Sequence, residues 1–257
     1  ITEGVNNSKN EVIVTTDGDC RVSTNWLTTI NSAYESNVIF VFGRVGYHKN
    51  NNLFRMMQNI EMLVLGATGG IQHYLGKVGM CNGANLSFRK NVFIELNGYS
   101  GNEDLPTGDD EFLLRKIAAK YPNGIRYIKN HDNMVFTEAM NSWQDLVNQK
   151  IRWASKWKHH KDWYTKLFGL FIFTYNFIFL FTVFFTFLNG FTITQLMLLI
   201  TLKLTLELIL TLIVFSSMKS LRTLIASLLL SIIYPFYTIF IGILSIQGKY
   251  KWKDRSY

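Results

Sequence analysis

The chain has 257 residues, of which 48% are hydrophobic and 15% aromatic, and its formal net charge is +8. This hydrophobic fraction is high for a soluble protein, and the excess lies in three stretches, residues 167–189, 191–215 and 224–246. The first has no charged side chain over 23 residues, which is enough to cross a bilayer core of about 30 Å. The composition therefore excludes a purely soluble protein.

The positive charge lies beside and within these apolar stretches. Residues 1–148 carry a net charge of −2, whereas a nucleic-acid-binding protein would show a basic patch on its soluble domain. Basic residues beside membrane spans suit anionic lipid headgroups and mark the cytoplasmic side. We predict an integral protein of the plasma (inner) membrane that contacts membrane lipids and no nucleic acid. Because the chain begins at Ile1 without a methionine or signal peptide, we expect an N-terminal truncation.

Residues 1–140 alternate short apolar runs with helical patterns, which predicts an α/β domain. The expected strands are residues 12–16, 38–45, 85–88, 125–128 and 134–136. The expected helices are residues 26–35, 53–65, 90–96 and 109–121. Acids at the first turn and Pro122 after the last turn favour the fourth of these helices.

Residues 141–257 are expected to form the membrane part. Residues 141–166 hold an amphipathic helix with a basic face and three tryptophans, which is typical of a helix at the membrane interface. Two to three transmembrane helices then fill residues 167–246, where Lys203 and Glu207 can pair across one helical turn. A basic tail follows at 247–257. Three crossings would place that tail outside, against the positive-inside rule, so either one stretch is re-entrant or missing N-terminal sequence changes the topology.

Three polar motifs contain candidate catalytic or ligand-binding residues. Asp17 and Asp19 follow an apolar strand in VIVTTDGDC, where they form either an ordinary Asx turn or a cation site completed by substrate phosphates. The acids of TGDDEFLLRK, residues 107–116, either interact favourably with the positive end of the helix dipole or include a general base. In QKIRW, residues 149–153, the side chains either snorkel at the membrane or bind a diphosphate and a sugar ring.

The order DGD, then DDE, then QKIRW followed by apolar spans resembles the membrane-bound family 2 glycosyltransferases. That family includes the synthases of cellulose, chitin, hyaluronan and poly-N-acetylglucosamine, and ceramide glucosyltransferase. The resemblance covers residues 1–160 and implies a partial GT-A (Rossmann-like) domain whose first strands are missing, so this fragment alone is expected to be inactive. It also implies a nucleotide-sugar donor, with a UDP-sugar expected first.

The resemblance assigns roles to individual residues. Asp17 and Asp19 match the family's DxD motif, which holds Mg²⁺ or Mn²⁺ and with it the donor diphosphate. Gln149, Arg152 and Trp153 match QxxRW, with Gln149 and Arg152 at the diphosphate and Trp153 at the acceptor. The segment CNGANLSFRK, residues 81–90, resembles the family segment that lines the acceptor sugar. Its distinctive positions are Gly83, Asn85 and Arg89.

The resemblance also implies an inverting displacement with a carboxylate base. The register of the family motif places this base at Asp109, with Gly108 where the family usually has glutamate, whereas the GDD form of hyaluronan synthases would place it at Asp110. The predicted acceptor is a growing polysaccharide at the cytosolic membrane face. The alternatives are transfer of one sugar to a polyprenyl phosphate or ceramide-like lipid, and a non-catalytic membrane scaffold.

Overall fold

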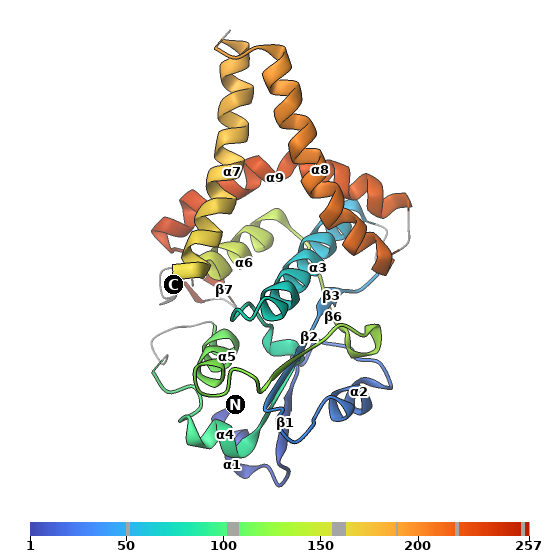
Figure 1. Cartoon of the computed structure of the whole chain (residues 1–257), viewed down its shortest axis with the longest axis vertical. Coiled ribbons are helices and arrows are strands. Elements are labelled where there is room, and N and C mark those ends of the chain that lie inside the picture. Colours follow the sequence, from blue (N-terminus) through green and yellow to red (C-terminus); the bar gives the residue numbers. More distant parts are fainter. Residues whose placement is uncertain are drawn as a thin grey trace. The chain divides into compact units, whose positions relative to one another are not determined.

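The computed structural model describes residues 1–49, 52–101, 108–155, 163–188, 190–218, 221–252 and 255–256. The chain divides into two compact units, the first made of residues 1–50 and 61–139 and the second of residues 51–60 and 140–257. Figure 1 shows that the first unit holds a mixed sheet with helices, while the second is almost entirely helical. The mixed α/β class expected for the N-terminal half is confirmed.

The sheet of the first unit has four strands in the order β1-β4-β2-β5. They are β1 (Val12–Thr15), β4 (Leu86–Arg89), β2 (Phe40–Gly43) and β5 (Ile125–Ile128). Strand β4 is antiparallel to both β1 and β2, whereas β2 and β5 are parallel. A second, parallel pair joins β3 (Val45–Tyr47) to β6 (Val135–Thr137). The expected strand at 38–45 is therefore two strands that belong to different sheets.

Helices cover both faces of the four-stranded sheet because residues alternate along each strand. On one face, Phe40 and Phe42 of β2 and Phe88 of β4 join a core with α4 (Lys90–Glu95) and α5 (Asp109–Lys120). On the other face, Val41 packs with Trp26 and with other residues around α2 (Trp26–Ser32). Three short helices complete this unit: α1 (Thr2–Asn7), η1 (Gly83–Asn85) and η2 (His131–Asn133).

Helix α3 (Leu53–Tyr74) is longer than the segment 53–65 predicted from periodicity. Its first turns belong to the second unit and the remainder to the first. The extra turns contain Gly69 and Gly70, residues with low helix propensity. A Cβ at Gly69 would overlap the Met80 carbonyl oxygen, and one at Gly70 would overlap the Tyr127 ring. Close packing therefore explains the glycines, and they do not end the helix.

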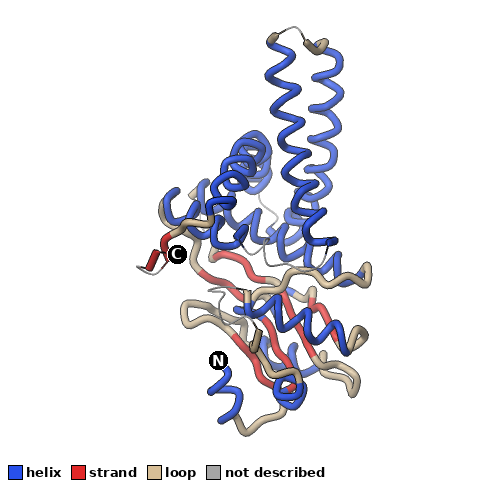
Figure 2. The backbone as a smooth tube through the Cα atoms, turned by 90° about the vertical axis from the view of Figure 1, so that its left-hand side faces the viewer, coloured by secondary structure: helices blue, strands red, loops and turns tan. Residues whose placement is uncertain are grey.

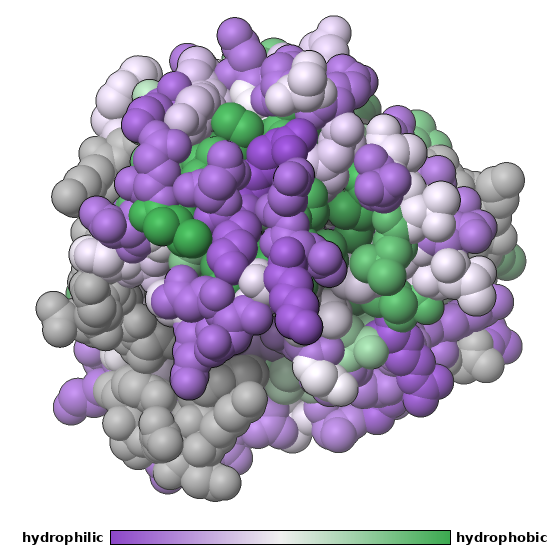
Figure 3. All heavy atoms as spheres, turned by 90° about the horizontal axis from the view of Figure 1, so that it is seen from below, coloured by the Kyte–Doolittle hydropathy of each residue, from purple (hydrophilic) through white to green (hydrophobic). Residues whose placement is uncertain are grey.

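The surface seen from below in Figure 3 is covered mostly by hydrophilic side chains, with apolar patches between them. The long helices of the second unit differ, because they expose many large apolar side chains. Examples are Phe171, Phe184 and Ile232, which are 60% to 66% exposed. Such surface is unfavourable in water but suits a hydrocarbon environment.

The second unit contains α6 (Trp143–Ser155), α7 (Trp163–Phe187), α8 (Ile193–Met218) and α9 (Leu221–Gln247). Among the described residues, α7 and α9 are long and apolar enough to cross a membrane. In Figures 1 and 2, α7 and α8 form an antiparallel pair, and α9 runs across this pair. The short strands β7 (Lys251–Trp252) and β8 (Arg255–Ser256) follow α9.

The expected pair between Lys203 and Glu207 is confirmed on α8. Lys203 is only 3% exposed; its Nζ also donates to the Ser231 carbonyl oxygen of α9 at 3.0 Å and lies 5.3 Å from the centre of the Phe179 ring on α7. The charge is thus compensated inside the helix bundle.

Candidate active site

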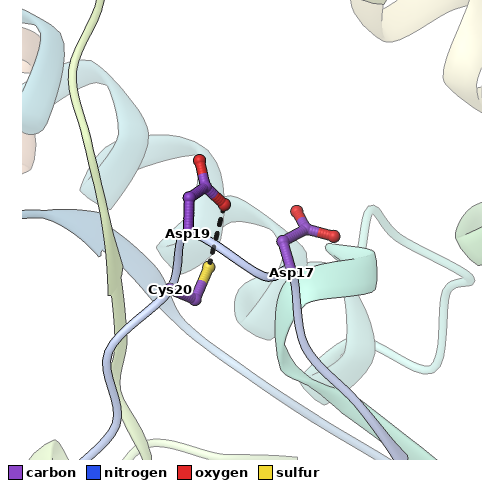
Figure 4. Close-up of side chains that lie close together, drawn as sticks. All are labelled: Asp17, Asp19 and Cys20. Carbon is purple, nitrogen blue, oxygen red and sulfur yellow. Dashed lines mark hydrogen bonds between the residues drawn. The ribbon is translucent and has the colours of Figure 1, made fainter.

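The DGD loop follows β1 directly and closes with a tight turn, in which the Cys20 amide donates to the Asp17 carbonyl oxygen at 3.1 Å. One ligand atom each from Asp17, Asp19 and Cys20 lie within 4.8 Å of one another. Figure 4 shows both carboxylates extending to the same side of the loop. The Cys20 thiol lies 4.0 Å from Asp19 Oδ1, and Thr137 Oγ1 donates to Asp19 Oδ2 at 3.3 Å.

This donor set fits a hard divalent cation. Carboxylate oxygens suit Mg²⁺ and Mn²⁺, and both carboxylates are exposed, which leaves room for phosphate oxygens to complete the coordination. Burial and, to a smaller extent, the charges of Asp17 and Asp19 raise the pKa of the Cys20 thiol above its usual value. A protonated thiol is a weak ligand, so the two carboxylates are the better ligands.

A single residue, Gly83, connects the DGD strand to the acidic helix. Thr15, the last residue of β1, donates its hydroxyl to the Gly83 carbonyl oxygen at 2.6 Å. The Gly83 amide donates to Asp110 Oδ2 at 2.8 Å. Two hydrogen bonds thus tie the end of β1, which leads into the DGD loop, to the first turn of α5.

Asp110, one of the two candidate bases on α5, is held by the backbone. Asp110 accepts backbone amides at both oxygens, from Gly83 at Oδ2 and from Glu111 at Oδ1, the latter at 2.9 Å. Burial and the nearby charges of Asp109 and Asp110 raise the pKa of the Tyr99 hydroxyl. Tyr99 therefore stays neutral, and its ring packs edge-on against Phe93 in the core. The helix begins after Gly108, whose φ of +101° favours glycine.

Asn85 lies inside the first unit and is only 1% exposed. Its Oδ1 accepts from Trp26 Nε1 at 3.1 Å, and its Nδ2 donates to the carbonyl oxygens of Arg44 at 2.8 Å and Asn133 at 2.6 Å. The side chain thus holds together α2, η2 and the junction between β2 and β3. Its predicted contact with an acceptor stays a prediction.

Arg89 lies at the other end of β4 from the DGD loop. In the β1–β4 register Leu86 pairs with Thr15, whereas Arg89 pairs with Val12. Its Nε donates to the Val38 carbonyl oxygen at 2.8 Å, and its guanidinium lies 5.5 Å from the centre of the Tyr34 ring. The structure thus places Gly83 next to the end of β1 that leads into the DGD loop and Arg89 away from it.

The QKIRW residues lie on α6 in the second unit. Gln149 is 5% exposed, and Ile151 packs against α9 at Ile241. Lys150 Nζ lies 4.4 Å from the centre of the Trp153 ring, a distance typical of a cation–π contact. One face of the Trp153 indole therefore has an intramolecular partner.

Sequence reasoning missed the Thr137 hydroxyl, which donates to Asp19. Thr137 is distant in sequence from the acid that it approaches, and no local pattern indicates it. The spacing of Cys20 and Cys81 indicates no metal site, yet the Cys20 thiol lies within the Asp17 and Asp19 cluster.

Comparison with known proteins identifies the family of the chain. A search of the curated proteins finds no match to this chain. The family model for "Glycosyl transferase family group 2" matches residues 12–246, from the first residue of β1 to the last turn of α9. This match confirms the family indicated by the three motifs and leaves the particular synthase type as a prediction. Because the matched region includes both units and most of the chain, the protein belongs to glycosyl transferase family group 2.

Proposed function

We propose that this protein is an inverting glycosyltransferase that extends a polysaccharide at the cytosolic face of the plasma (inner) membrane. Membership of the family supports glycosyl transfer, with a nucleotide-sugar donor and an acceptor. The observation that supports the finer proposal is the link through Gly83, which ties the strand before the DGD loop to the acidic helix α5. A UDP-sugar is the proposed donor.

The binding roles follow from the chemistry of the residues. Asp17 and Asp19 would hold Mg²⁺ or Mn²⁺, which supplies positive charge to the leaving diphosphate. Gln149 and Arg152 are proposed, from the family motif, to bind a donor diphosphate, since a guanidinium matches phosphate oxygens. Trp153 is proposed to stack on the acceptor sugar.

The remaining acceptor roles differ in how directly they act. The Gly83 backbone links the end of β1 to Asp110, so it is the most direct of the proposed acceptor contacts. Asn85 and Arg89 are proposed to position the loop and strand around it, given their bonds to Arg44 and Val38.

Asp109 is the proposed general base, because the register of the family motif places the base there. Asp110 is proposed to fix the loop, since both of its oxygens accept hydrogen bonds from backbone amides. In the proposed step an acceptor hydroxyl oxygen attacks the anomeric carbon and loses its proton to Asp109. The bond between that carbon and the diphosphate oxygen breaks, and the diphosphate leaves with the electron pair.

The arrangement of the second unit supports a topology with an even number of crossings. Asn148 Oδ1 of α6 accepts from the Lys251 amide at 3.2 Å, so the segment after α9 returns to α6. If α7 and α8 cross the membrane and α9 does not, α6 and Lys251 share one side, as the positive-inside rule requires. In a Cys20→Ser/Cys81→Ser background, an impermeant maleimide should label Lys249→Cys and Lys9→Cys from the same side. Labelling from opposite sides would contradict this topology.

The function is tested on the complete protein in membranes, supplied with UDP-sugars and Mn²⁺. We expect Asp19→Asn to weaken metal-dependent binding of the nucleoside diphosphate, and Asp109→Asn to abolish transfer while binding remains. Glu3→Gln is the matched control, since it removes one exposed carboxylate from α1. A single sugar on a lipid would favour a lipid acceptor, and absent or metal-independent binding would favour a scaffold. Full turnover in Asp109→Asn would refute the proposed base.

A further inference from the structure

A groove of about 1220 Å³ lies within the second unit, between α6, α9 and residues 249–251. Helix α6 contributes Trp143 and Val147 to its lining, and α9 contributes Ile233, Phe236 and Phe240. None of these residues belongs to the motifs assigned above to donor, acceptor or cation. The groove is therefore separate from the residues proposed to carry glycosyl transfer.

The walls of the groove are apolar and accessible. Phe236 is 62% exposed, Phe240 53% and Trp143 52%. Large apolar side chains gathered in an open groove of a membrane helix suit contact with acyl chains. A tryptophan beside aliphatic and phenyl groups is also typical of the level at which acyl chains meet headgroups. The walls thus suit a hydrocarbon chain better than a sugar or a nucleotide.

The end of the groove formed by the segment after α9 carries positive charge. Lys249 and Lys251 both line it and both are exposed. The bond between the Lys251 amide and Asn148 Oδ1 holds this segment against α6. Within the described parts of the chain, neither lysine side chain forms an ion pair. Two ammonium groups at one end of an apolar groove complement a phosphate attached to an acyl chain.

We propose that this groove binds one anionic phospholipid, with an acyl chain along α6 and α9 and the phosphate at Lys249 and Lys251. Charge complementarity identifies the occupant, because a zwitterionic lipid would bring its own cation close to the two ammonium groups. The bound lipid would hold α6, the helix that carries Gln149 to Trp153. The site does not depend on the proposed transfer reaction, and its test needs no turnover.

The test is native mass spectrometry of the complete chain in detergent, with equimolar palmitoyl-oleoyl phosphatidylglycerol and phosphatidylcholine. We expect one phosphatidylglycerol to be retained per chain, in preference to phosphatidylcholine. Removing one lysine near an anionic headgroup should reduce this preference about 5-fold, and removing both about 25-fold. Glycerol phosphate without acyl chains should not displace the lipid, because the apolar walls contribute to binding.

Two variants and one control make the test specific. Lys249→Gln with Lys251→Gln should lose the preference for phosphatidylglycerol, and Ile233→Trp, which fills the groove and keeps both lysines, should lose retention of either lipid. The control Arg222→Gln with Lys9→Gln also removes two exposed positive charges, neither of which lines the groove, and should behave like the wild type. Equal retention of the two lipids, retention of neither, displacement by glycerol phosphate, or an unchanged preference in the double lysine variant would each overturn the proposal.

Discussion

Replacing Asn85 with alanine tests whether this residue acts through structure or through substrate contact. The change removes the hydrogen bonds to Trp26 Nε1 and to the carbonyl oxygens of Arg44 and Asn133. Trp26, Asn85 and Asn133 are all less than 9% exposed, so the groups left behind are poorly hydrated. Each unpaired buried polar group costs about 1 kcal/mol at the low end of the usual range. The Arg44 carbonyl oxygen keeps a bond from the Val135 amide at 3.2 Å, so two groups lose their partner. The local stability should therefore fall by about 2 kcal/mol.

Hydrogen–deuterium exchange by mass spectrometry measures this loss where it occurs. A change of about 2 kcal/mol corresponds to about 30-fold faster exchange, expected in peptides covering α2, β3 and β6. Asn31→Ala is the matched control, because Asn31 is exposed on α2 and alanine favours helix, so exchange should be unchanged or slower. Wild-type exchange in Asn85→Ala, with an effect confined to the KM for the acceptor, would refute the structural role.

Three further changes probe other parts of the chain. Burial and the nearby Arg126 lower the pKa of His73, so its contribution to stability is present above about pH 6.5 and is lost as the pH falls; thermal melts of His73→Gln should depend less on pH between 7 and 5. Gly108→Ala forces an alanine to a φ of +101°, which should cost about 1 kcal/mol and lower the Tm by about 2–4 °C. Lys203→Met leaves the partly buried Glu207 carboxylate without its ammonium partner and should cost about 3 kcal/mol, whereas adding Glu207→Leu should restore most of the Tm in detergent.

Hydrophobic periodicity located most elements of the first unit but could not assign strands to sheets. Residues 38–45 form one apolar run, yet β2 pairs with β4 and β5, whereas β3 pairs with β6. The change occurs at Gly43 and Arg44, where a Cβ on Gly43 would overlap Asn133 Oδ1. The close approach of η2 therefore sets this break, and that contact joins residues about 90 positions apart in sequence.

The acidic motifs could be found from sequence because each is a local cluster. The link between them could not be found from sequence, because it depends on the backbone of Gly83. The Gly83 carbonyl oxygen accepts a hydrogen bond from Thr15, and the Gly83 amide donates one to Asp110. The bonds to the Asp110 carboxylate are likewise invisible in the sequence, because they come from backbone amides. The opposite case is Arg89, which matches a motif position but lies at the far end of β4 because of the antiparallel register.

Hydropathy alone also cannot tell whether an apolar helix crosses the membrane or lies across neighbouring helices. Residues 224–246 are as apolar as residues 167–189, and α7 and α9 both meet the length and composition of a membrane span. A helix satisfies its backbone hydrogen bonds internally, so it can lie across its neighbours in hydrocarbon as well as cross the bilayer. What distinguishes α9 is tertiary contact: Ser231 accepts a bond from Lys203 of α8, and Lys251, beyond its end, bonds to Asn148 of α6. The bond between Lys251 and Asn148 is the contact on which we base the proposal that α9 does not cross, because it returns the chain to α6.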